Sequence, residues 1–212
     1  MAFALVESGS ITSYPKGNRG ITIGDNQYPA SIFTIWTESE RNAIGIYTIE
    51  IDSTNFKNQE WYINTNITYS YDSSANKVKG AYGTATAKAH ADTKWTQAQI
   101  DDPSLVGQAP AGADTNTVRI EGLKTQLISK VKGDAEGILN ETDWYVTRKA
   151  EKSTAIPSAI TTHRDAVRTK QAEMETAITN AADTAALETL YTYVEKDGSR
   201  TRPLGELPRL EQ

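Results

Sequence analysis

The spacing of apolar residues changes along the chain, and this change limits its possible folds more than any other feature. Apolar and polar residues alternate over 61–71, which is typical of a β-strand that buries one face. Over 120–138 the apolar residues recur every three or four positions, as they do on one side of a helix. We therefore predict an α+β fold, with a small antiparallel β-rich N-terminal domain and a helical C-terminal region.

The β-rich domain is expected to cover residues 1–88. Short apolar runs are separated by turn residues such as Gly24. Thr37 is followed three positions later by Glu40, the pattern of a capping box, so a short helix should precede a strand at 44–51.

The longest predicted hairpin joins the alternating strand at 61–71 to a returning strand at 78–86 through a polar turn at 72–76. One of its faces is rich in aromatic residues. That face predicts either the inner side of a sheet, which we favour, or a sugar-stacking platform that would use Trp61, Tyr69 and Tyr82.

Prolines and glycines interrupt the pattern before the helices begin. We interpret residues 89–115 as a linker with one short helical turn near 96–100. Two helices that suit a hairpin are expected near 116–139 and 157–181, with a last short helix after them. The remaining predicted boundaries are a helical interaction region over 116–194 and a flexible tail over 195–212.

The second long helix carries a narrow apolar stripe. Ile160, Val167 and Met174 follow one another at sevenfold spacing, and Arg164 lies four positions after the first of them. Such a stripe is typical of a coiled-coil seam or a helical hairpin. The sequence leaves open whether it pairs with 116–139 of the same chain or with another chain.

Residues 141–157, ETDWYVTRKAEKSTAIP, connect the two helices and place two large aromatic residues beside basic ones. Trp144 and Tyr145 either cap the helical junction or anchor a partner protein. Arg148, Arg164 and Arg168 pair either with acidic groups of a partner or locally with Glu151, Asp165 and Glu173.

Composition argues against several classes of function. A net charge of -5 provides no basic field for a nucleic acid, and the absence of cysteine excludes thiolate catalysis and cysteine metal sites. The N-terminus lacks a signal-peptide pattern, and no apolar run approaches the roughly 20 residues that span a bilayer. We expect synthesis in a cytoplasm, without membrane insertion.

No residue pattern predicts an enzyme or a cofactor site. His90 and His163 are far apart in sequence and supply too few donors for a zinc site, so we expect His163 to be a half-exposed helix residue. The acidic pairs that a glycosidase would need are interpreted as solvated side chains. They are Glu38 with Glu40 and Asp101 with Asp102.

A longer motif runs through the helical region as Leu-x-x-Thr-Asp-Trp, a proline, and then His-Arg-x-x-x-Arg. Its positions are Leu139, Thr142, Asp143, Trp144, Pro157, His163, Arg164 and Arg168. The surrounding segment, 138–178, resembles the C-terminal segment of many tailed-bacteriophage tail proteins, including tail-fibre assembly proteins. The N-terminal sequence FALVESGSITSYP is similar to a short β-module that begins related tail proteins.

The resemblance implies a virion tail protein, made in the host cytoplasm and forming a homo-oligomer, that binds tail-fibre or baseplate subunits. The expected binding residues are Trp144, Tyr145, Arg148, Ile160, Arg164, Val167 and Met174. The aromatic hairpin and the long tail depart from the simple assembly-protein pattern and suit a permanent attachment part. Two alternatives stay open: an assembly chaperone released before the virion matures, and a carbohydrate-binding module.

Overall fold

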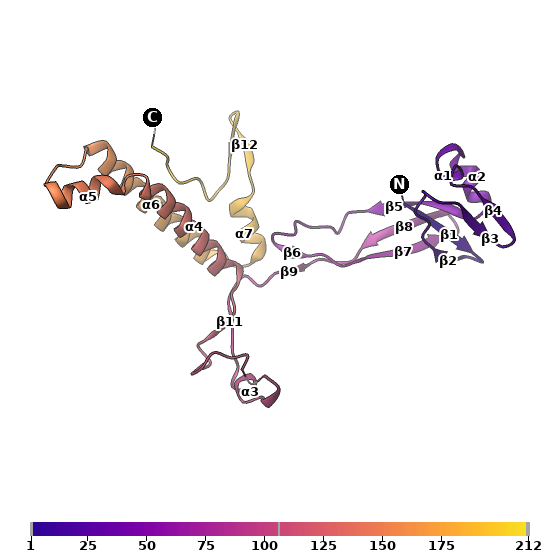
Figure 1. Cartoon of the computed structure of the whole chain (residues 1–212), viewed down its shortest axis with the longest axis horizontal. Helices are drawn as coiled ribbons and strands as arrows, with labels where there is room; N and C mark the ends of the chain where they lie inside the picture. The colour runs from indigo at the N-terminus through magenta and orange to yellow at the C-terminus, as the bar shows by residue number, and fades with distance from the viewer. Residues whose placement is uncertain (1, 106, 211–212) are drawn as a thin grey trace. The chain divides into compact units, whose positions relative to one another are not determined.

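A computed structural model describes residues 2–105 and 107–210 of the chain. The chain divides into two compact units, Met1–Thr86 and Ala87–Gln212 (Figure 1). The first unit is rich in strands and the second contains the long helices, which confirms the predicted α+β class.

The first unit is built on a five-stranded sheet with the order β2-β1-β5-β8-β7. Neighbouring strands are antiparallel except β5 and β8, which are parallel and depart from the predicted arrangement. The exception arises because the chain leaves β5, forms the edge strand β7 first, and then turns back into β8 between them. The strands are β1 (Phe3–Glu7), β2 (Ser10–Ser13), β5 (Ile46–Asp52), β7 (Ile67–Asp72) and β8 (Lys77–Tyr82).

One face of this sheet is covered by the short helix α1 (Ile32–Ile35), whose Ile32 and Phe33 pack against Phe3, Leu5 and Ile46. Helix α2 (Glu38–Ala43) follows and begins with the predicted capping box. The strands β3 (Ile21–Ile23) and β4 (Asn26–Tyr28) form a small hairpin whose apolar residues extend the same cluster.

The opposite face buries a second cluster of Ala4, Tyr47, Ile49 and Val78. Neither α1 nor α2 contributes to it. The edge strands β2 and β7 instead contact each other, so the sheet curls over its own apolar side chains. This closure explains how a five-stranded sheet buries two faces with so few helices.

The strand predicted over 61–71 is interrupted. β6 (Tyr62–Ile63) and β7 are separate, and β9 (Thr86–Ala87) pairs with β6 in a two-stranded sheet. The Asn64 side chain donates to Lys57 O at 2.7 Å and accepts from Lys57 N at 2.8 Å. These local bonds compete with the strand ladder and explain the break.

Residues 89–115, predicted as a linker, belong to the second unit. Their first residues accept hydrogen bonds from the first backbone N–H groups of the next long helix. Leu123 N donates to Ala89 O at 3.0 Å, and Lys124 N donates to His90 O at 3.0 Å. The segment continues through β10 (Thr93–Lys94), α3 (Gln97–Ile100) and a 3-10 turn (Pro103–Leu105). β10 pairs with β11 (Val118–Ile120), a strand at the predicted start of the first long helix. The backbone of the segment therefore caps α4 (Leu123–Asn140) instead of acting only as a mobile connection.

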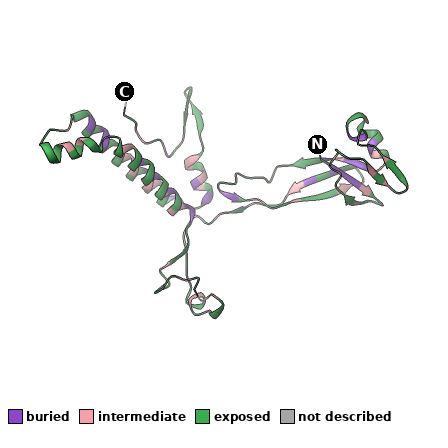
Figure 2. Cartoon of the chain, in the orientation of Figure 1, coloured by how far each residue is buried: buried purple, intermediate pink, exposed green. Residues whose placement is uncertain are grey.

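The second unit is organised around an antiparallel hairpin of α4 and α6 (Ser158–Asn180). Near one end Lys124 Nζ donates to Thr179 O at 2.8 Å, and near the other Arg164 contacts Leu139 O at 2.8 Å. Figure 2 shows buried residues at intervals along both helices. The predicted helical hairpin thus forms within one chain.

Two shorter helices flank this pair, α5 (Asp143–Lys152) between α4 and α6, and α7 (Thr184–Tyr191) after α6. The tail predicted to be flexible contains a hairpin of β12 (Val194–Lys196) and β13 (Ser199–Thr201). Leu204 is only 2% exposed, and its N–H donates to Leu190 O at 3.0 Å. A buried leucine at this position anchors the tail despite its many charged residues.

Candidate partner-binding surface on α5

Arg164 of α6 holds the junction between α4 and α5. Its guanidinium donates to Leu139 O at 2.8 Å and to Thr142 Oγ1 at 2.7 Å, and it forms an ion pair with the Asp143 carboxylate at 2.8 Å. The Arg164 side chain is only 10% exposed, so these charge-assisted bonds replace most of its hydration.

The Arg164 contacts bring together residues that sequence reasoning did not connect. Thr142 is 3% exposed, and its hydroxyl also donates to Leu139 O at 3.0 Å. The sequence predicts partners of Arg164 on another protein or among local acidic residues, and the structure corrects this by placing them at the end of α4 and the start of α5. The partners lie more than twenty positions away, beyond the reach of any helical spacing rule.

The predicted apolar stripe also lies inside the chain. Ile160 is 7% exposed, Val167 is 0% and Met174 is 4%. The facing residues of α4, Leu127, Val131 and Ala135, are buried as well. These three stripe residues and Arg164 therefore hold the hairpin together, and the expectation that they contact a partner directly is corrected.

The remaining predicted binding residues form a group on α5 that we call the α5 surface cluster, consisting of Trp144, Tyr145 and Arg148. Trp144 is 52% exposed. Its ring centroid lies 3.9 Å from that of Tyr145, with 33° between the ring planes. The Arg148 guanidinium carbon lies 4.6 Å from the Trp144 centroid and 5.2 Å from the Tyr145 centroid.

The α5 surface cluster combines a large apolar surface with a positive charge. Among the described residues, Arg148 makes no ion pair, so the two aromatic rings hold its guanidinium in place by cation–π attraction. The cluster follows directly after a junction that is held by the buried contact of Arg164 with Thr142 and by its ion pair with Asp143. Tryptophan, tyrosine and arginine are the residues most enriched among those that dominate protein–protein binding.

The basic residue Arg168 belongs to the same motif but lies on the exposed side of α6. It pairs with Asp165 at 3.5 Å, and both side chains are more than half exposed. This local pair was one of the two predicted possibilities. Exposed pairs of this kind contribute little to stability.

The acidic pairs considered for glycosidase chemistry occupy helix ends and turns. The Thr37 backbone N–H and hydroxyl donate to Glu40 and hold the pKa of its carboxyl below the usual range. The Ser104 hydroxyl and N–H lower the pKa of Asp102 in the same way. A general acid requires the opposite shift, so these bonds favour the solvated interpretation.

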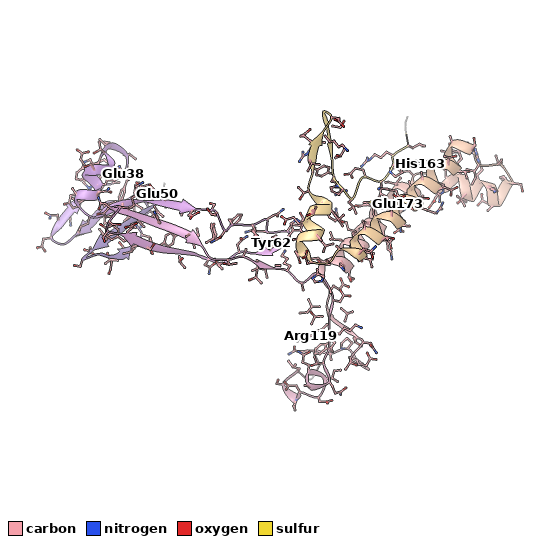
Figure 3. All side chains as sticks on the ribbon, turned by 180° about the vertical axis from the view of Figure 1, so that it is seen from behind. Glu38, Glu50, Tyr62, Arg119, His163 and Glu173 are labelled. Carbon is pink, nitrogen blue, oxygen red and sulfur yellow. The ribbon has the colours of Figure 1, made fainter. Side chains whose placement is uncertain are left out.

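The two histidines lie on different elements. His90 lies in the capping segment, and His163 lies on α6 (Figure 3). His163 is 9% exposed, so it is buried instead of half-exposed as predicted, because it lies beside Arg164 on the inner side of the helix. Within residues 2–105 and 107–210 no group of three or more histidine, aspartate or glutamate side chains could hold a metal ion.

The aromatic residues proposed for sugar stacking do not share one open surface. Trp61 is 2% exposed. Tyr82 packs against Phe56 with ring centroids 4.9 Å apart, and Tyr69 packs against Tyr14 at 5.0 Å. The platform of Trp61, Tyr69 and Tyr82 is therefore corrected, since a buried indole cannot stack on a ligand.

Comparisons of the chain with protein-family models, curated proteins and solved structures found no match. No helix in the described part of the chain is both long and apolar enough to cross a membrane.

Proposed function

We propose that the chain is a structural or attachment protein of a bacteriophage tail, and that its α5 surface cluster binds tail-fibre or baseplate subunits. The proposal begins from the resemblance of residues 138–178 to the C-terminal segment of phage tail proteins. It also uses the arrangement of the residues that carry this resemblance.

The observation that supports it most is the contact of Arg164 with Leu139, Thr142 and Asp143. All four are positions of the motif. The motif therefore describes a helical junction, and the residue that follows Asp143 is the exposed Trp144. A junction that is rigid inside and aromatic outside suits a docking surface.

Binding would cover Trp144 and Tyr145 and bring Arg148 against carbonyl or carboxylate groups of the tail subunit. Removal of a central tryptophan from such an interface typically weakens binding by about 2 kcal/mol or more. Homo-oligomerisation, which the resemblance implies, would use surfaces other than the Ile160, Val167 and Met174 stripe, because that stripe is already buried.

The test is a quantitative pull-down with the tagged full chain from phage-infected cells, with tail subunits identified by mass spectrometry. We expect Trp144→Ala to reduce recovery of tail-fibre or baseplate subunits by about tenfold or more. Phe56→Ala is the matched control, because Phe56 is an exposed aromatic residue of the other unit. Recovery of no tail subunit, or equal recovery with both variants, would count against the proposal.

The chaperone alternative uses the same surface and differs in the fate of the protein. Mass spectrometry of purified virions separates the two functions. A structural part remains in the particle in proportion to the other tail proteins, whereas a released chaperone is absent.

A further inference from the structure

We propose a second binding site, in the first unit, for a saccharide that carries an anionic group. A cavity of about 330 Å³ lies at the loop that follows β2. Its lining includes Tyr14, Lys16, Asn18 and Arg19. This volume is within the range of small-molecule pockets and suits one or two sugar rings.

Two glycines hold the loop in place. A Cβ on Gly17 would lie 3.0 Å from the buried Phe3 ring, and Gly17 has φ +76°, a conformation that favours glycine. A Cβ on Gly20 would lie 2.8 Å from Tyr28 O. The backbone thus packs against the buried Phe3 at Gly17 and against the end of β4 at Gly20, so the side chains between them start from a pre-organised loop.

The charge of the loop points to an anionic ligand. Lys16 and Arg19 are exposed, and neither makes an ion pair with any residue that the structure describes. Two cations without acidic partners, in a chain with a net charge of -5, form a local positive surface. The side-chain amide of Asn18 can donate to and accept from hydroxyl groups.

The aromatic wall points to a sugar. Tyr14, which lines the cavity, is 53% exposed, and its ring packs against the partly exposed Tyr69 with 49° between the ring planes. The exposed Tyr14 ring, held by its contact with Tyr69, offers an apolar face for the C–H groups of a pyranose. The tilted pair does not form the parallel slot that would hold a nucleotide base from both sides. The expected ligand is therefore a sugar that carries a carboxylate or a phosphate.

Isothermal titration calorimetry on the full chain tests this site with two anionic probes, trigalacturonic acid and glucose 6-phosphate. Their neutral counterparts are trigalacturonic acid methyl ester and glucose. We expect saturable binding of at least one anionic probe, weaker by about tenfold for its neutral counterpart. The probe that binds identifies whether a carboxylate or a phosphate is preferred.

The variants assign the binding to the loop. Tyr14→Ala and the double variant Lys16→Gln/Arg19→Gln should each weaken binding by about tenfold, while Lys79→Gln, an exposed cation of the same unit, should not. Equal binding of charged and neutral sugars, unchanged binding in the double variant, no saturable binding of either probe, or tighter binding of AMP would overturn the proposal. The proposal does not depend on the α5 surface cluster, so Trp144→Ala should leave this binding unchanged.

Discussion

Arg164 donates a hydrogen bond of 2.7 Å to the hydroxyl of Thr142, a buried contact between residues 22 positions apart. The same guanidinium also contacts Leu139 O and the Asp143 carboxylate. One side chain of α6 therefore satisfies groups at the end of α4 and at the start of α5. Because the last carbonyl groups of a helix have no partner within it, this residue caps the end of α4 and ties it to the side chains at the start of α5.

We expect Arg164→Ala to lower the free energy of unfolding by about 2–4 kcal/mol, because it leaves buried hydrogen-bonding groups without a partner. Chemical denaturation followed by circular dichroism measures this change. Arg168→Ala is the control, since its pair with Asp165 is exposed and should matter by less than about 1 kcal/mol. Similar losses in the two variants would show that the buried junction is not the cause.

Gly122 should not tolerate a side chain. A Cβ at this position would lie 2.3 Å from Ala91 C and 2.4 Å from Ala91 O, both backbone atoms. We expect Gly122→Ala to lower the melting temperature and to lower the free energy of unfolding by more than about 1 kcal/mol. Gly133→Ala is the matched control on the same helix, because nothing lies within 4 Å of a Cβ there. It should stabilise the chain by about 0.5–1 kcal/mol.

Asp92 should make the stability of the second unit depend on pH in acid. Gly122 N and the Thr125 hydroxyl each donate to its carboxylate at 2.7 Å, and these bonds lower the pKa of Asp92. Because the folded pKa is below the unfolded one, the stabilisation is complete above about pH 4 and is lost as the pH falls through the folded pKa. Denaturation at a series of acid pH values should show a smaller decline for Asp92→Asn than for Glu136→Gln. An identical decline in both would contradict this role.

Tyr47 should make the stability of the first unit depend on pH in alkali. Burial, together with the hydroxyl of Tyr71 at 3.2 Å, raises the pKa of Tyr47 to about 12. An unfolded tyrosine ionises near pH 10, so the stabilisation is present below about pH 10 and is lost as the pH rises toward the folded pKa. Absorbance titration of tyrosinate should show a late-ionising group that is missing in Tyr47→Phe. Its persistence in that variant would assign it to another residue.

Local patterns predicted the elements of this chain well where neighbouring residues decide the structure. The capping box at Thr37 and Glu40 depends on four consecutive residues, and it formed as predicted. The stripe through Ile160, Val167 and Met174 is buried as its spacing indicated. The α+β class followed from the two spacings of apolar residues, every second residue over 61–71 and every third or fourth residue over 120–138.

The predictions failed where a contact with residues outside a regular pattern overrides that pattern. Asn64 breaks a regular alternation through its bonds to Lys57. Asp92 and the backbone near it cap α4, although their sequence resembles a linker. Leu204 anchors a tail whose composition favours disorder.

The sequence by itself determined the α+β class, the capping box before β5 and the apolar side of the long helices, because these depend on spacing within a few residues. Only the tertiary structure decided that the stripe closes within one chain, that Arg164 turns inward and that Trp144 stays outside. Side-chain burial depends on which elements meet, and that choice is made by contacts between residues far apart in the chain.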